Sequence, residues 1–155
     1  ASLAQMTGIA TTQVAVNTTY QKVKQQLPVD ENLEGFLPAH HMAITQLAVV
    51  YCNALMSHPV LRADTFPDFI FSAEPAVAFT ASGRAAIIDP LLSALVVSLH
   101  AQDINTSQTP STRESLNSLI DEMTRCGTSC PASTTMNTAI AVCAAALGSA
   151  TMLVH

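Results

Sequence analysis

Four cysteines are the residues of this chain whose types and spacing are best suited to chemistry: Cys52, Cys126, Cys130 and Cys143. Thiolates bind zinc or take part in redox exchange, and both uses most often involve a Cys-x-x-Cys spacing, which is absent here. Cys126 and Cys130 are separated by three residues instead. An even number of cysteines with this spacing favours disulfide bonds, and free buried thiols or a metal or redox site are the alternatives.

Four cysteines allow three disulfide pairings, of which we favour Cys52 with Cys143 and Cys126 with Cys130. The first bond would join two apolar helical stretches and close a loop of about 90 residues, which stabilises a fold by roughly 4–5 kcal/mol on the chain-entropy description. Gly127 makes the tight second loop feasible. Because disulfides persist in oxidising compartments, the cysteines predict an exported protein, extracellular or at the cell surface, with the periplasm as the alternative location.

The adjacent histidines His40 and His41 are the next candidates, as ligands of haem or a metal ion. Neighbouring helical residues point about 100° apart, so both cannot hold one ion. Either one would need a distant partner such as His58, His100 or His155, and no Cys-x-x-Cys-His haem-attachment motif is present. We therefore interpret the pair as one exposed and one packed residue in the first turn of a helix, with a haem- or metal-binding electron-transfer domain as the alternative.

Motifs for enzymatic catalysis are missing from the sequence. It contains no nucleophile elbow, phosphate-binding loop, dinucleotide fingerprint or His-Glu-x-x-His motif. The close carboxylates, Glu31 with Glu34 and Asp121 with Glu122, are typical of solvated helix faces. We accordingly expect no catalytic residues and no cofactor, and predict that the protein is not an enzyme.

Apolar residues at helical spacing predict an all-α fold, a compact bundle of about five helices held together by disulfides in a single domain over residues 1–155. The expected helices cover residues 12–27, 38–57 and 84–99, and two more begin near 111 and 131. Pro38 suits the first turn of the second helix, and Ser111 to Glu114 form a capping box. Pro90 either kinks the third helix or starts a new one.

Residues 59–80, the Phe/Pro-rich segment, have the least regular pattern in the chain. They contain three prolines and four of the five phenylalanines. Prolines argue against long helices here, so the segment is predicted to be an irregular insertion. Its aromatic side chains are expected to anchor the segment onto the core, and a ligand pocket is the alternative.

Charged residues are scarce, at 11% of the chain, whereas about 25% is usual for globular domains. The net charge is −5 and the six basic residues are scattered, which argues against a nucleic-acid partner. So few charges leave apolar surface for another domain or another copy of the chain to cover. The most apolar run, residues 139–154, is 16 residues long, shorter than the roughly 20 that span a bilayer. A buried core helix is therefore expected there, with a membrane or pilin-like anchor as the alternative.

Several stretches, taken in order, resemble a helical region of large secreted multidomain proteins of Gram-negative bacteria that also carry laminin-G-like domains. The stretches are Tyr20 to Pro28, Gly35 to Leu37 with His40 or His41, Gln46 to Ala48, Tyr51 to Leu55, Ile88 to Leu91, and Val142 to Ala150. The resemblance would cover the chain from about Met6 to its end. It implies an exported, surface-associated or extracellular module, and it carries over no activity and no site residues.

The sequence thus predicts a noncatalytic structural or interaction module of an exported bacterial protein. Its expected partners are other protein domains or copies of itself, and its setting an extracellular or cell-surface assembly.

Overall fold

Helices make up all of the regular secondary structure in the residues that the structure describes, which are 2–26, 33–100 and 109–150. This computed structural model contains no strand in those ranges, so the prediction of an all-α fold is confirmed. The α-helices are α1 (Ser2–Thr7), α2 (Val14–Gln26), α3 (Leu33–Ser57), α4 (Pro59–Thr65), α5 (Pro75–Ala78), α6 (Ala81–His100), α7 (Thr109–Met123) and α8 (Thr134–Ala150). A 3-10 turn, η1 (Gly127–Ser129), lies between α7 and α8.

The predicted number of about five helices is wrong, because the described residues form eight α-helices. The additional ones are α1, α4 and α5, which have six, seven and four residues. Helices this short span less than two turns, so they show no apolar periodicity that a sequence window can detect.

Two of the short helices lie in the Phe/Pro-rich segment, which is therefore only partly irregular. Pro59 and Pro75 are the first residues of α4 and α5. Proline has no N–H to donate, and the first helical N–H lacks an intrahelical acceptor in any case, so proline fits this position. The prolines thus begin two short helices, which is compatible with the prediction that they exclude long ones.

Three of the predicted helix starts lie too late in the chain, among them that of α6, which begins at Ala81 and not at residue 84. The longest helix, α3, begins at Leu33, so Pro38 lies inside it. Helix α7 begins at Thr109, and Ser111 is a residue of its first turn instead of its N-cap. Pro110 explains the earlier start of α7, because a proline just after the helix start is compatible with the first turn. Helix α6 continues through Pro90 without interruption.

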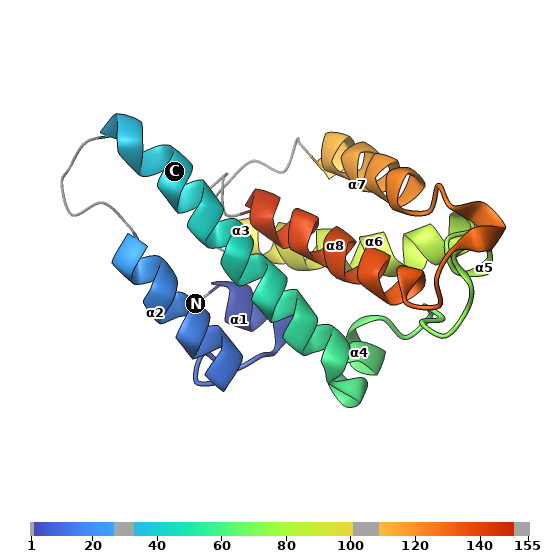
Figure 1. Ribbon diagram of the computed structural model, residues 1–155, viewed down its shortest axis with the longest axis horizontal. Coiled ribbons are helices and arrows are strands. Elements are labelled where there is room, and N and C mark those ends of the chain that lie inside the picture. The colour runs from blue at the N-terminus through green and yellow to red at the C-terminus, as the bar shows by residue number, and fades with distance from the viewer. Residues whose placement is uncertain (1, 27–32, 101–108, 151–155) are drawn as a thin grey trace.

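Helices α3 and α8 cross at the centre of the molecule and make its most extensive helix–helix contact (Figure 1). Helices α6 and α7 pack on α8, and α2 and α1 pack on α3. Most of the buried apolar side chains belong to one continuous cluster that takes residues from α3, α6, α7 and α8 and from the Phe/Pro-rich segment. Cys52, Leu55, Ile87, Ile120 and Val142 are among its fully buried members.

Within the described residues, no single helix is both long enough and apolar enough to span a membrane. One bent pair, residues 39–57 of α3 followed by α4, meets the criteria of length and composition together, with an angle of 102° between its two parts.

Two buried threonines one turn apart on α8 have different surroundings. The Thr135 hydroxyl donates a 2.7 Å hydrogen bond to the carbonyl oxygen of Ala73, which ties the Phe/Pro-rich segment to α8. The Thr138 hydroxyl is fully buried and has no hydrogen-bond partner. An unsatisfied buried hydroxyl destabilises a fold, whereas an apolar group of the same shape does not.

We predict that Thr138→Val raises the free energy of unfolding by about 1 kcal/mol, because valine has the same shape and no polar group to satisfy. The matched variant Thr135→Val should lower it by about 1–2 kcal/mol, because the Ala73 carbonyl loses its donor. Urea unfolding under non-reducing conditions measures both values. Two variants that shift stability in the same direction would contradict this assignment of the hydroxyls.

Gly83, at the start of α6, lies against the end of α5. A Cβ atom at this position would overlap the backbone carbonyl of Ala78, which cannot move without shifting the chain. We predict that Gly83→Ala destabilises the protein by about 1–3 kcal/mol, even though alanine is the better helix former.

Gly148 in α8 provides the control, because its Cβ would lie 3.9 Å from Thr45 Oγ1 and 4.0 Å from Ala48 Cβ, which is ordinary contact. Gly148→Ala should therefore be neutral or stabilising by up to about 1 kcal/mol. Thermal melting of the two variants checks the pair, and a Gly83→Ala protein that melts no lower than the parent contradicts the close approach.

Candidate functional site

Cys52 of α3 and Cys143 of α8 form a disulfide bond at the centre of the fold. Their sulfur atoms are 2.08 Å apart and their Cα atoms 5.9 Å apart. Both residues are fully buried. This is one of the two pairs that the sequence predicts, and it links residues 91 positions apart across the helix crossing.

Cys126 and Cys130 form the second bond, with an S–S distance of 1.96 Å and a Cα–Cα distance of 5.0 Å. The bond encloses η1, and Cys126 is exposed to solvent. Gly127 has a φ of +58°, in the left-handed region that side chains other than glycine rarely adopt, which lets the chain turn inside so short a loop.

The two bonds leave no free cysteine in the chain. Because metal ligation and nucleophilic attack both require a thiolate, the bonded cysteines are unsuited to either. Two disulfides in one chain indicate an oxidising environment outside the cytoplasm.

The histidines are not brought together. His40 is half-buried and His41 is exposed, both on α3. His58 is the N-cap of α4, where its Nδ1 atom accepts a 3.4 Å hydrogen bond from the Leu61 N–H. The His100 side chain and His155 lie outside what the structure describes. No group of three or more His, Cys, Asp or Glu side chains suited to a metal ion occurs among the described residues, so the haem or metal alternative gains no ligand set there.

The aromatic side chains of the Phe/Pro-rich segment pack against one another and against the core. The ring centroids of Phe69 and Phe71 lie 4.8 Å apart, and those of Phe66 and Phe71 lie 6.0 Å apart. Phe66, Phe69 and Phe79 are buried, so these rings anchor the segment as the sequence suggested.

An open groove of about 580 Å³ lies beside the rings, between α4 and the chain that follows it, and we call it the Arg62 groove. Phe69, Ile70 and Phe71 line it together with Met136 of α8. Arg62 is the only charged residue among the ten that line it. In the sequence Arg62 is one of six scattered basic residues, and its position within the Phe/Pro-rich segment is the only signal that sets it apart.

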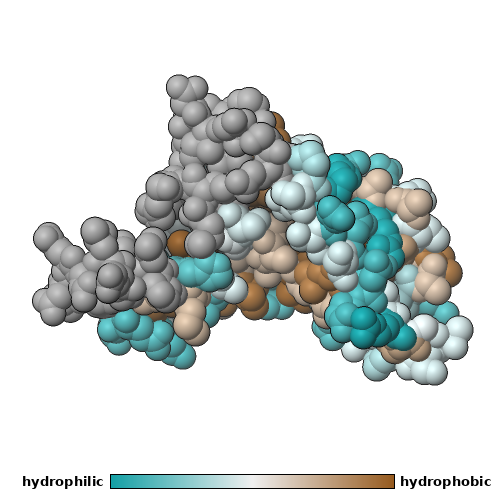
Figure 2. Space-filling view, turned by 90° about the horizontal axis from the view of Figure 1, so that it is seen from above, coloured by the Kyte–Doolittle hydropathy of each residue, from teal (hydrophilic) through white to brown (hydrophobic). Residues whose placement is uncertain are grey.

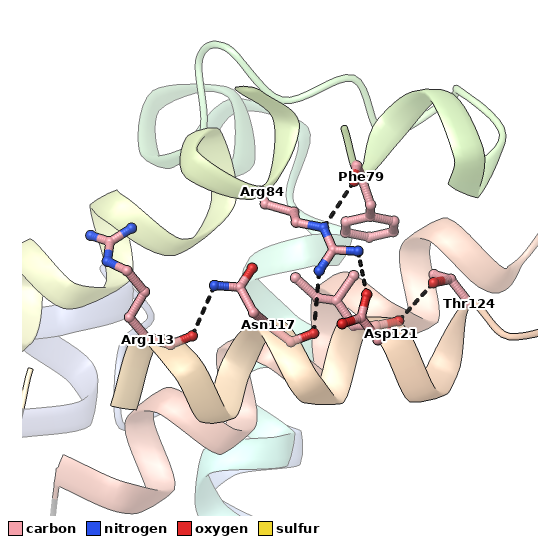
Figure 3. A network of polar contacts seen from close by, with 7 residues as sticks. Phe79, Arg84, Arg113, Asn117, Asp121 and Thr124 are labelled. Atoms are coloured by element: carbon pink, nitrogen blue, oxygen red, sulfur yellow. Dashed lines mark hydrogen bonds and ion pairs between the residues drawn. The ribbon is translucent and has the colours of Figure 1, made fainter. Parts of the chain in front are cut away.

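The four arginines of the chain differ in their partners. Arg84 donates to the carbonyl oxygens of Phe79 and Asn117 and to the Asp121 carboxylate, and so fastens the start of α6 to α7 (Figure 3). Arg113 pairs with Asp89 at 2.6 Å and Arg125 with Glu122 at 2.8 Å. Within the described residues, Arg62 has no carboxylate partner.

Arg62 is nevertheless held in place. One of its terminal nitrogens donates a 2.8 Å hydrogen bond to the carbonyl oxygen of Met56 near the end of α3. Its guanidinium carbon lies 5.0 Å from the centroid of the Phe71 ring, a cation–π distance. A half-buried cation without a carboxylate, on an apolar wall, makes the Arg62 groove the most chemically distinctive site among the described residues.

Comparison with protein-family models, with curated proteins and with solved structures gives no match for this chain. The resemblance to a helical region of secreted multidomain proteins therefore stays a sequence-based expectation.

We predict that the two disulfides differ in their reactivity toward a thiol reductant, because only the Cys126–Cys130 bond is near solvent. In the native protein, mild dithiothreitol followed by maleimide labelling should modify Cys126 and Cys130 first. Cys52 and Cys143 should react only after denaturant is added. Peptide mass mapping identifies the labelled residues, and labelling of all four in parallel would contradict the buried position of the central bond.

Proposed function

We propose that this protein is a noncatalytic structural or interaction module of an exported bacterial protein, working in an extracellular or cell-surface assembly. It packs against neighbouring domains or against copies of itself. The observation that carries the proposal is the side of α3 that faces solvent. We call this surface the outer face of α3, and it consists of Met42, Thr45, Gln46, Val49 and Asn53.

The outer face of α3 follows the helical repeat, since its residues are spaced by three or four positions. It carries no charge, because residues 39–57 contain no Asp, Glu, Lys or Arg. Met42 is 63% exposed and Val49 is 39% exposed. A helix surface that stays in water normally carries charged side chains, so an uncharged face of this length is typical of one that a partner covers.

Further large apolar side chains reach the surface elsewhere in the molecule. They are Val14, Tyr20, Val60, Ile70, Val77 and Val97. Figure 2 shows one face of the molecule, on which hydrophobic residues reach the surface beside the hydrophilic residues of the α7 side. This distribution agrees with the low charge content of the sequence.

The cysteines support the exported location, because two disulfides need an oxidising compartment. A noncatalytic role is supported by the bonds and contacts that the chemically reactive side chains already make within the fold. The cysteine sulfurs are bonded to one another, and Arg84 donates from each of its three nitrogen atoms in holding α6 to α7. Tyr51 is buried, and burial raises the pKa of its hydroxyl further above neutral pH.

Multi-angle light scattering after size exclusion tests the proposal. If copies associate through the outer face of α3, the parent protein should have a mass that is a multiple of 16.3 kDa. The double variant Met42→Glu, Val49→Glu should be a monomer, because association would bury like charges without a partner. Thr18→Glu, on the exposed surface of α2, should leave the assembly unchanged.

A monomeric parent at about 100 µM would reject association between copies and leave a neighbouring domain as the partner. A photo-crosslinking residue at position 49 of the full-length exported protein then decides the question. It should crosslink to another domain, whereas the same residue at position 18 should not. An uncrosslinked position 49 in that experiment rejects the interaction role of this face.

A further inference from the structure

The Arg62 groove is open to solvent and has the volume of a small-molecule site. Its volume of about 580 Å³ lies within the range of roughly 300–1,000 Å³ that is usual for ligand pockets. Its walls are mainly apolar, with Ile70 exposed, Phe71 and Met136 half-buried, and Ser72 as a neutral polar residue. An apolar cleft with one placed polar group is the common pattern of sites that orient an organic ligand.

The charge of the groove selects the ligand. A guanidinium has five N–H donors in a planar arrangement that matches a carboxylate. Within the described residues, Arg62 uses one terminal nitrogen for the Met56 carbonyl, and its other donors have no protein acceptor. No carboxylate lines the groove, so the positive charge is uncompensated there. An anionic group is therefore attracted and a cationic one is repelled.

We propose that the Arg62 groove binds a small organic carboxylate with an aromatic or aliphatic body. The carboxylate takes the unused N–H donors of Arg62, and the body lies against Phe71, Ile70 and Met136. This inference is independent of the proposed function, because the groove belongs to α4 and the chain after it and not to the outer face of α3.

Arg62 is already positioned for this role in the free protein. The hydrogen bond to Met56 and the stacking on Phe71 hold its side chain, so little conformational freedom is lost when a ligand binds. The same two contacts also serve the fold, since the last carbonyl groups of α3 need donors. The test must consequently separate binding from stability.

Titration with 3-phenylpropanoate, followed by calorimetry and by amide chemical shifts, is the primary experiment. We expect saturable binding, with the largest shifts at residues 59–72 and at Met136. The amide 3-phenylpropanamide has the same body without the charge and should bind about ten- to a hundredfold more weakly. Titration with octanoate, which has an aliphatic chain in place of the phenyl ring, gives a second affinity. Its comparison with that of 3-phenylpropanoate shows whether the apolar wall of the groove prefers an aromatic or an aliphatic group.

Two variants of Arg62 separate charge from structure. Arg62→Gln keeps N–H donors on a shorter side chain but loses the charge, and it should weaken 3-phenylpropanoate binding to the level of the amide. Arg62→Lys keeps the charge without the planar pair of donors and should give an intermediate affinity. Lys22→Gln, which removes a positive charge from the exposed surface of α2, should bind like the parent. Thermal melting of each variant shows that it is folded.

Shifts confined to the groove, together with discrimination between acid and amide, support the proposal even where an Arg62 variant is less stable, because both are measured on the parent protein. The proposal is overturned if the parent shows no saturable binding. It is also overturned if acid and amide bind equally, if the shifts lie elsewhere, or if a folded Arg62→Gln protein keeps the affinity of the parent.

Discussion

The crossing of α3 and α8 is the constraint on which the rest of the structure depends. The two helices are joined by the Cys52–Cys143 disulfide, whose residues are buried at the crossing. By the chain-entropy description, a bond that closes a loop of about 90 residues stabilises the fold by roughly 4–5 kcal/mol. The remaining long helices pack on one side or the other of this pair, with α2 on α3 and with α6 and α7 on α8.

The same crossing accounts for the distribution of charge. Neither residues 39–57 of α3 nor residues 134–150 of α8 contain Asp, Glu, Lys or Arg. A charge on either helix at the crossing would be removed from water without a partner, which costs several kcal/mol. Charged residues are found instead on the helices outside the crossing, where Arg84 and Arg113 link α6 to α7 by ion pairs. The absence of charge also extends to the outer face of α3, which burial in the core does not explain, and this mismatch is the basis of the proposed interaction role.

The Phe/Pro-rich segment shows how a stretch with little periodicity becomes ordered. Its prolines begin two short helices, its rings enter the core, and the Thr135 hydroxyl holds the Ala73 carbonyl. These contacts leave Arg62 on an open apolar wall, because its guanidinium is held by Met56 and Phe71 and not by a carboxylate. A segment that serves mainly to cover the core thus also presents the most distinctive chemical group of the described surface.

The sequence by itself was sufficient for the all-α class and for the long helices, because helical periodicity is a local property. Among three possible pairings it favoured the two disulfides that the structure contains, because Cys52 and Cys143 each lie in an apolar helical stretch and Gly127 permits a short loop between Cys126 and Cys130. It did not reveal α1, α4 and α5, whose few residues show no periodicity. It also placed the starts of α3, α6 and α7 too late, since Pro38 lies in the second turn of α3 and not in its first, whereas Pro110 lies in the first turn of α7. Only the tertiary structure decided that, within the described residues, Arg62 lacks a carboxylate partner while Arg84 has one, and that Met42 and Val49 face solvent. These outcomes depend on which distant helix lies opposite each side chain, and no local pattern in the sequence encodes that arrangement.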